Sequence, residues 1–185
     1  MATRTVDLIR HGQYGPDGEL TPLGVEQIER LAARYRDEGA PTKLWVSPQP
    51  RAQHTGRILA AAFDLEPRTI MAIAEAVPSR PDPPPKAFAD FPEESIAKGR
   101  ARLDKILAKL VKRARGTDRH MVLACHGNVT RYLWTRALGL DPLAWWTLSI
   151  HNGSLTRFRV HADGRIKGIR FNDVGHLPSA LQTEA

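Results

Sequence analysis

The chain has 185 residues, of which 42% are hydrophobic and 25% are charged, and its formal net charge is +7. This length fits one domain over residues 1–185 with a substantial core, and the composition excludes membrane-spanning, fibrous and disordered classes. Because Cys125 is the only cysteine, and because Met1 leads directly into a predicted strand with no room for a leader peptide, we expect a cytoplasmic protein without disulfides.

The first part of the chain alternates short apolar runs with amphipathic stretches. Thr21 and Pro22 mark the start of a helix, since Thr is a favourable N-cap and Pro suits the first helical position. The predicted elements are a strand at 5–10, a helix at 21–39, a strand at 43–47, a helix at 50–63 and a short strand at 68–71.

The segment from Pro78 to Pro92 contains six prolines, which exclude a regular helix or a central strand. The strand and helix pattern continues after it, so we interpret the segment as an ordered loop inside the same domain. A long loop of this kind is often functional. We expect it to cover the edge of the sheet as a lid near the functional site.

The second part of the chain continues the alternation and ends in a hairpin. We predict a helix at 93–115, a strand at 121–125, a helix at 129–138 and, after an apolar run at 148–150, strands at 154–160 and 166–171 around an Asp163-Gly164 turn. The predicted fold class is α/β. It is a three-layer sandwich with a mostly parallel central sheet, helices on both faces and a C-terminal antiparallel hairpin.

Three of the predicted strands are followed closely by residues suited to phosphate. Arg10 and His11 end the first strand, Arg51 follows the second, and His126 follows the strand at 121–125. Ligands of open α/β sheets bind outside the carboxyl ends of the strands. Arginine grips phosphate with two donors, and imidazole is a nucleophile at neutral pH. Gly12 would let the backbone approach a ligand closely. The pattern indicates phosphoryl transfer through a histidine.

Four segments of the chain resemble the histidine phosphatase superfamily, and together they span much of its length. They are Leu8–Gly12, Leu20–Gly24, Ser47–Ala52 and Cys125–Gly127. Further segments look like its branch of mitochondrial phosphoglycerate-mutase-like serine/threonine protein phosphatases, namely Glu75–Pro84, His126–Tyr132, Asn152–Ser154 and Gly175–Pro178.

The chain departs from that branch in three ways. It lacks the branch's anchoring and multimerising N-terminal extension, and it has Arg-His-Gly and Cys-His-Gly-Asn where the branch has Arg-His-Ser and Cys-His-Ala-Asn. These departures favour a free-standing cytoplasmic relative.

The chemistry assigns a role to each catalytic candidate. We predict that His11 attacks phosphorus and carries a phosphohistidine, while its other ring nitrogen donates to a backbone carbonyl. His126 would complete the phosphate site as a cation once phosphate is bound. Glu75 is the best candidate for protonating the leaving oxygen and then activating water, a role that the resemblance also implies.

The predicted phosphate-binding residues are Arg10, Arg51, Gly127 and Asn128. The two arginines would hold the non-bridging oxygens. The Gly127 amide and Asn128 begin a helix, whose N-terminus favours anions. The remaining histidines have no metal-ligand spacing, so we expect neither a metal nor a cofactor.

The predicted function is metal-independent hydrolysis of phosphomonoesters, with phosphoserine and phosphothreonine proteins as the favoured substrates. The alternatives are a small-molecule phosphatase, a phosphoglycerate-mutase-type phosphotransferase and a non-catalytic phosphoprotein-binding module. The mutase is disfavoured because its relatives carry insertions for which this chain is too short. The expected partner is a phosphorylated substrate, with no nucleic acid and no membrane. The hairpin and the edge at 148–150 could support a homodimer.

Basic residues are concentrated between Lys98 and Arg119, on and after the predicted helix at 93–115. We favour the solvated face of that helix as the explanation. A docking surface for acidic partners is the alternative. Nucleic-acid binding is disfavoured because no recognition helix, zinc site or aromatic-stacking pattern accompanies the charge.

Overall fold

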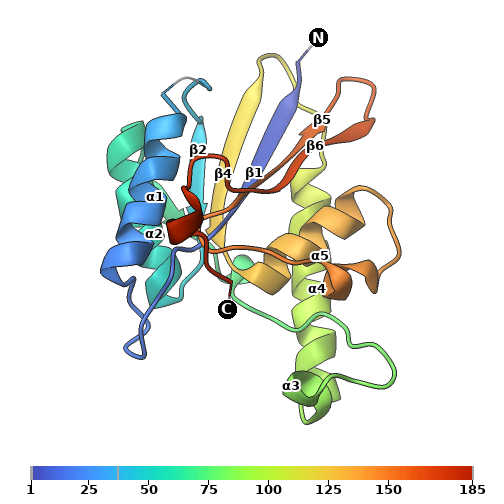
Figure 1. The fold of residues 1–185 in the computed structure, drawn as a ribbon. Coiled ribbons are helices and arrows are strands. Elements are labelled where there is room, and N and C mark those ends of the chain that lie inside the picture. The colour runs from blue at the N-terminus through green and yellow to red at the C-terminus, as the bar shows by residue number, and fades with distance from the viewer. Residues whose placement is uncertain (1, 37, 185) are drawn as a thin grey trace.

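The computed structural model describes residues 2–36 and 38–184 and contains one mixed sheet between two layers of helices (Figure 1). The strands are β1 (Arg4–Arg10), β2 (Lys43–Val46), β3 (Pro67–Thr69), β4 (Arg119–Cys125), β5 (Leu155–Val160) and β6 (Ile166–Asp173). Their order across the sheet is β3-β2-β4-β1-β5-β6. The first four are parallel, while β5 runs antiparallel to β1 and β6 antiparallel to β5.

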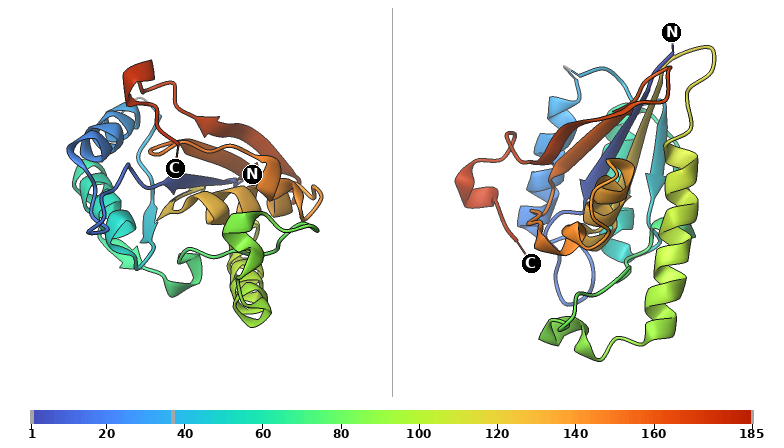
Figure 2. Two further views of the ribbon diagram at one scale, coloured as in Figure 1. Left: turned by 60° about the horizontal axis from the view of Figure 1, so that its bottom comes forward. Right: turned by 90° about the vertical axis from the view of Figure 1, so that its right-hand side faces the viewer.

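Two pairs of helices cover the two faces of the sheet (Figures 1 and 2). One pair is α1 (Pro22–Arg34) with α2 (Pro50–Phe63), and the other is α4 (Glu93–Leu110) with α5 (Gly127–Ala137). The short α3 (Lys86–Ala89) lies in the proline-rich loop, and 3₁₀ turns form at Met71–Ile73, Ala144–Thr147 and Ser179–Leu181. The predicted α/β sandwich with its C-terminal hairpin is confirmed. Within the described residues, no helix combines the length and apolarity needed to span a bilayer.

The central strands bury side chains on both faces, which explains their nearly continuous apolar sequences. Leu8 and Leu123 belong to the core under α4 and α5, whereas their neighbours Ile9 and Val122 belong to the core under α1 and α2. All four are fully buried. Polar chemistry is therefore directed to the ends of these strands, where the loops leave the sheet.

The start of α1 is fixed against the loop that follows β1. The Thr21 side chain caps the helix by accepting a hydrogen bond from the Gly24 amide at 3.1 Å. A Cβ on Gly12 would lie 2.4 Å from the Gly24 carbonyl oxygen, so only glycine permits this approach. The expectation that Gly12 makes room for a ligand is therefore wrong, because its neighbour is the backbone of α1.

Several elements differ at their ends from the sequence-based expectation, for example α1, which ends at Arg34 instead of residue 39. Two further departures lie where arginine side chains donate to backbone carbonyls. Helix α4 ends at Leu110 instead of residue 115, and there Arg4 Nη1 donates to the Lys109 carbonyl at 2.7 Å. The run at 148–150 forms no strand edge. Its Leu148 and Ile150 carbonyls instead accept hydrogen bonds from Arg131 at 2.9 Å and from Arg10 at 2.6 Å. In both places an arginine from a distant part of the chain donates to the backbone carbonyls, which no local sequence pattern shows.

Candidate active site

The predicted site residues come together at the carboxyl ends of β1 and β4 and the start of α2. A cavity of about 420 Å³ opens there. The predicted residues that line it are Arg10, His11, Arg51, Glu75, Gly127 and Asn128. The seventh, His126, is fully buried, and its ring centre lies 5.2 Å from that of His11. Four segments distant in sequence, at residues 10–11, 51, 75 and 126–128, thus supply one site.

His11 is held in the tautomer that a nucleophile requires. Its Nδ1 lies 2.8 Å from the Gly12 carbonyl oxygen, which can only accept, so Nδ1 carries the hydrogen. Nε2 therefore has a free lone pair, which accepts a hydrogen bond from Arg51 Nε at 3.0 Å. Burial, together with the charges of Arg10 and Arg51, lowers the pKa of His11 to about 3. The ring is neutral near pH 7.

The backbone of His11 is fixed from both neighbouring strands. Its amide donates to the Cys125 carbonyl at 3.0 Å, which continues the pairing of β1 with β4. Its carbonyl accepts from the Gly153 amide at 3.1 Å and from Asn152 Nδ2 at 3.3 Å. These contacts hold the imidazole in place without any ligand.

Three guanidinium groups give the cavity its positive charge. Arg10 Nη1 is anchored on the Ile150 carbonyl, and Arg51 lies over the Tyr14 ring at 4.6 Å from its centre. Arg131 was not predicted as a site residue, although it lines the cavity and donates to the Asn128 side-chain oxygen. With that oxygen engaged, the Asn128 amide group is the part left to bind an anion.

His126 is oriented by a chain of hydrogen bonds. The Ser47 hydroxyl donates to Gln49 Oε1 at 2.6 Å, so His126 Nε2, also 2.6 Å from Ser47 Oγ, must donate to that oxygen. Nδ1 is then unprotonated, and it is buried without a partner among the described residues. Burial, with repulsion from His11 and Arg51, lowers the pKa of His126 to about 2. With this pKa the ring is neutral near pH 7.

Glu75 lies in the loop after the Met71–Ile73 turn, and two contacts position it. Its Oε1 accepts from the Ala76 amide at 3.0 Å, and its own amide donates to Gln49 Oε1 at 3.1 Å. Arg102 of α4 supports the loop by donating to the carbonyls of Met71 and Ala74 at 2.7 and 2.9 Å. Burial raises the pKa of Glu75, although the charges of Arg51 and Arg10 act against this, and a raised pKa favours the protonated form that a proton donor needs.

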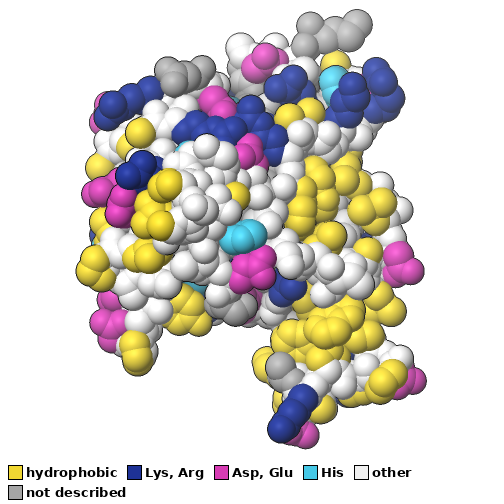
Figure 3. All heavy atoms as spheres, viewed as in Figure 1, with side chains coloured by type: hydrophobic (Ala, Val, Ile, Leu, Met, Phe, Trp, Pro, Cys, Tyr) yellow, Lys and Arg dark blue, Asp and Glu magenta, His cyan; other side chains and the backbone are white. Residues whose placement is uncertain are grey.

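The proline-rich loop reaches the site, as expected for a segment near it. Phe88 of this loop lines the catalytic cavity and packs against Trp145 and Trp146 with ring centres 6.0 Å apart. A second cavity of about 520 Å³ adjoins the first and shares Glu75, Phe88 and Asn128 with it. Figure 3 shows hydrophobic side chains gathered over α3 and the hollow beside it.

Several residues of the site were not predicted from the sequence. Ser47 follows β2 as the predicted residues follow β1 and β4, and this position could have identified it. Glu184 lines the cavity because Gln27 of α1 binds the C-terminal segment through the Leu181 carbonyl at 2.7 Å. No local pattern signals this contact. The other missed residues are Tyr14, Gln49, Arg102 and Arg131.

Comparisons with known proteins agree with this arrangement. A model of the histidine phosphatase superfamily (branch 1) matches residues 6–77 and 68–173. The chain is 35% identical over 186 residues to the mitochondrial serine/threonine-protein phosphatase Pgam5 of Caenorhabditis elegans, and 32% identical over 195 residues to human PGAM5. Each match covers 96% of this chain and 65% of the relative. The chain thus spans about two thirds of the length of these relatives.

Solved structures show the same fold. A phosphoglycerate mutase from Plasmodium falciparum superposes with a TM-score of 0.70 at 22% identity, covering 97% of this chain and 96% of that one. A putative alpha-ribazole-5'-P phosphatase from Escherichia coli gives a TM-score of 0.72 at 20% identity, covering 92% and 98%.

The relatives also correct one expectation. The cytoplasmic location expected from the sequence is wrong by this comparison, because the proteins that match most of the chain are named as mitochondrial. The expectation rested in part on the strand that follows Met1, and that observation did not predict the compartment. The family model, the relatives above 30% identity and the superposed folds lead to one conclusion: this chain belongs to the histidine phosphatase superfamily.

Proposed function

We propose that the protein is a metal-independent phosphatase that hydrolyses phosphomonoesters through a phosphohistidine on His11. The single observation that carries the proposal is the environment of His11 Nε2. This atom is unprotonated, its lone pair accepts a hydrogen bond from Arg51, the ring is fixed by the hydrogen bond at Nδ1, and the cavity around it is lined by three guanidinium groups. The phosphatase relatives and the family support the same activity.

The first half of the reaction transfers the phosphoryl group to the protein. Arg10, Arg51 and Arg131 bind its non-bridging oxygens and stabilise their charge. Nε2 of His11 attacks phosphorus with its lone pair, and the bond from phosphorus to the ester oxygen breaks. Glu75 donates its proton to that leaving oxygen, which departs as an alcohol.

The second half returns the free protein. Glu75, now a carboxylate, takes a proton from water as the water oxygen attacks the phosphohistidine. The bond between phosphorus and Nε2 breaks, and its electrons return to the ring as the lone pair. Inorganic phosphate leaves, His11 is again neutral, and Glu75 is again protonated. His126 and the α5 N-terminus at Gly127 and Asn128 add donors to the phosphate in both halves.

Phosphoserine and phosphothreonine in proteins are the proposed substrates. The names of the relatives support this class. The adjoining apolar cavity, with Val77, Phe88 and Phe91 in its lining, begins at Glu75, where the leaving group must lie. It offers room for the side chains that flank a phosphorylated residue. Arginines serve as the phosphate ligands in this scheme, so the chemistry requires no metal.

Substrate profiling in EDTA tests the proposal. Phosphoserine and phosphothreonine peptides are compared with a panel of sugar phosphates, phosphoglycerate and p-nitrophenyl phosphate, and His11→Ala serves as the matched inactive variant. The proposal predicts turnover that EDTA leaves unchanged and a kcat/KM highest for the peptides. Equal rates for wild type and His11→Ala would leave only a phosphoprotein-binding module. A strong preference for one metabolite would reject the protein substrates but not the chemistry.

A further inference from the structure

A third cavity, of about 800 Å³, lies at the end of the sheet opposite the candidate active site, and its lining is charged. It lies where β1, β2 and β4 begin, whereas the catalytic cavity lies where β1 and β4 end. Each of β1 and β4 has seven residues, which separates the two cavities by about 20 Å at 3.3 Å per residue. Lys and Arg side chains gather toward the top of Figure 3, the end at which β1 begins.

The lining of this cavity is almost purely cationic. Six basic side chains face it, from the starts of three strands and from the loop after α4: Arg4, Lys43, Lys112, Arg113, Arg115 and Arg119. Among the residues that the structure describes, its lining includes no carboxylate, and Met121 is its one apolar member. Within residues 2–36 and 38–184, none of the six forms an ion pair. The nearby Asp118 side chain is engaged by the Thr3 amide at 2.7 Å.

Arg4 forms the fixed part of this cavity. Its Nη1 donates to the Lys109 carbonyl at 2.7 Å, which ties the guanidinium to the end of α4, while its Nε is buried without a partner among the described residues. Burial and the charge of Arg119 lower the pKa of Arg4. Like charges are thus held together with no counter-charge from the protein, and an anion bound between them would relieve their repulsion.

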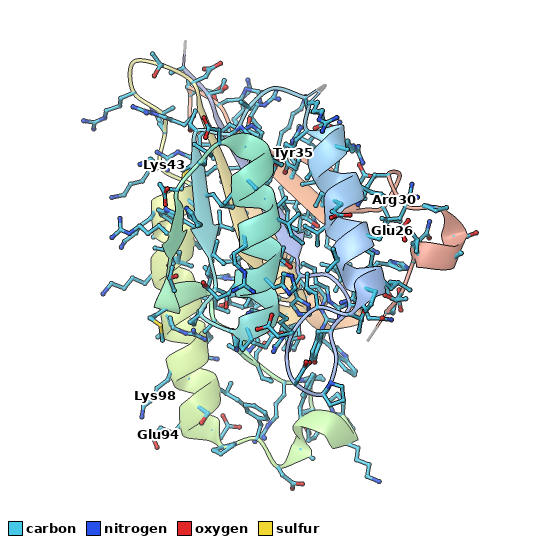
Figure 4. The ribbon with its side chains drawn as sticks, turned by 90° about the vertical axis from the view of Figure 1, so that its left-hand side faces the viewer. Glu26, Arg30, Tyr35, Lys43, Glu94 and Lys98 are labelled. Carbon is cyan, nitrogen blue, oxygen red and sulfur yellow. The ribbon has the colours of Figure 1, made fainter. Side chains whose placement is uncertain are left out.

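The volume and lining of this cavity indicate which kind of anion it would bind. Its volume lies in the range of small-ligand sites, roughly 300 to 1,000 Å³. The cations converge from separate segments on one hollow instead of forming a stripe, and no aromatic side chain lines it for base stacking. A nucleic acid or a lipid tail would therefore find few of the contacts it uses. Lys43 lies at this end of the molecule, at the start of β2 and away from α3 (Figure 4).

We propose that this cavity is a second anion site, separate from catalysis, that binds a compact polyanion of linked phosphate groups. Several phosphates in one small ligand match several cations around one hollow, and arginine and lysine are the side chains that bind phosphate oxygens. A single orthophosphate neutralises only part of the cluster and binds more weakly.

Titration of the ¹⁵N-labelled full chain with tripolyphosphate tests the site. We expect saturable shifts of the amides at 42–44 and 112–119, and at least tenfold weaker binding there in the double variant Lys43→Gln/Arg115→Gln. Both side chains are exposed and make no hydrogen bond among the described residues, so the fold is retained. The control Arg30→Gln/Arg57→Gln removes the same charge from exposed positions outside both cavities and keeps wild-type affinity.

Three results would overturn the proposal: no shift at these amides, equal weakening in the control variant, or tighter binding of an acidic peptide or an oligonucleotide than of tripolyphosphate. Hydrolysis of p-nitrophenyl phosphate is measured alongside and is expected to be the same in the double variant and the wild type. Failure of the anion site is thus distinguishable from failure of the catalytic proposal.

Discussion

Arg51 donates a hydrogen bond from Nε to Nε2 of His11 across 3.0 Å. The guanidinium thereby engages the lone pair of the proposed nucleophile, and its position over the Tyr14 ring holds it there. A phosphoryl group that enters the cavity must take this position between the two side chains. The same arginine that protects the lone pair then becomes a ligand of the phosphate oxygens.

Removal of Arg51 should change both the acidity of His11 and the rate. The charge of Arg51 contributes to the low pKa of His11, so Arg51→Ala is expected to raise that pKa. Loss of a phosphate ligand should lower kcat/KM on the order of a hundredfold. NMR titration of the ring and steady-state kinetics measure the two effects. Arg57→Ala, on the same helix but exposed, is the control, and an unchanged His11 pKa in Arg51→Ala would contradict the contact.

Glu75→Gln tests the proton donor through the leaving group. The serine oxygen of a phosphoserine peptide is a poor leaving group, so kcat/KM, which reports the first step, should fall roughly 10² to 10⁴-fold with this substrate. With p-nitrophenyl phosphate the first step needs little proton donation, so kcat/KM should change little. Burial raises the pKa of Glu75, and the protonated form is lost as the pH rises through that value. The wild-type peptide rate should therefore fall on the alkaline side, and the variant should lack this limb. Hydrolysis of the phosphohistidine is common to both substrates and should be slow with either, so the comparison rests on kcat/KM. Equal losses in kcat/KM on both substrates would reject the role of Glu75 as proton donor.

Phosphate binding should draw a proton onto His126. Its Nδ1 carries no hydrogen in the empty site, so it can donate to a phosphate oxygen only after protonation. Calorimetry of phosphate binding at about pH 8, where free phosphate is the dianion, in buffers of different ionisation enthalpy should report net proton uptake. His126→Asn should bind without it. If His126→Asn still takes up a proton on binding phosphate, a group other than His126 is protonated and the prediction is wrong.

Asp7 of β1 and Arg157 of β5 form a buried ion pair that contributes to the stability of the fold. Asp7 is fully buried and accepts hydrogen bonds from Arg157 at 2.6 and 2.8 Å, from His120 and from Tyr35. Burial alone would raise the pKa of Asp7, but the hydrogen bonds from Arg157 and His120 lower it below its usual value. A carboxylate with a lowered pKa stabilises the fold above the unfolded-state pKa of about 4, and this contribution is lost as the pH falls further.

Asp7→Asn should therefore cost roughly 3 to 5 kcal/mol in the free energy of unfolding, because it removes the buried carboxylate from Arg157 and leaves that guanidinium only its pair with Glu38. The exposed pair of Glu26 and Arg30 on α1 (Figure 4) offers the control, since Arg30→Gln should cost less than about 1 kcal/mol. Urea denaturation at several pH values measures both. Below about pH 4 the wild type should lose stability more steeply than Asp7→Asn, and parallel curves would contradict the role of Asp7.

The sequence allowed prediction of what local patterns encode. Helix α2 begins and ends where expected, at Pro50 and Phe63, because Pro at its start and the apolar spacing are local signals. The positions of Arg10, His11 and His126 could also be predicted from local signals. Each follows or ends a predicted strand, and the carboxyl ends of parallel strands lie at one edge of the sheet.

Contacts between distant segments could not be predicted from the sequence. Three features of the site depend on packing between segments that are far apart in the sequence. Arg102 supports the Glu75 loop, Ser47 and Gln49 orient His126, and Glu184 lines the cavity. The C-terminal hairpin was expected, but its place beside β1 follows from the whole sheet. A homodimer stays a prediction, although residues 148–150 serve the catalytic cavity instead of a strand edge.

Trapping of the intermediate tests the central claim most directly. Glu75→Gln is mixed with p-nitrophenyl phosphate, quenched in alkali, digested and sequenced by mass spectrometry. The variant should form the phosphohistidine but hydrolyse it slowly, because water lacks its base. The account predicts one alkali-stable, acid-labile phosphoryl group on His11, absent from the Glu75→Gln/His11→Ala variant. Release of nitrophenol with the phosphoryl group on another residue, or on none, would contradict it.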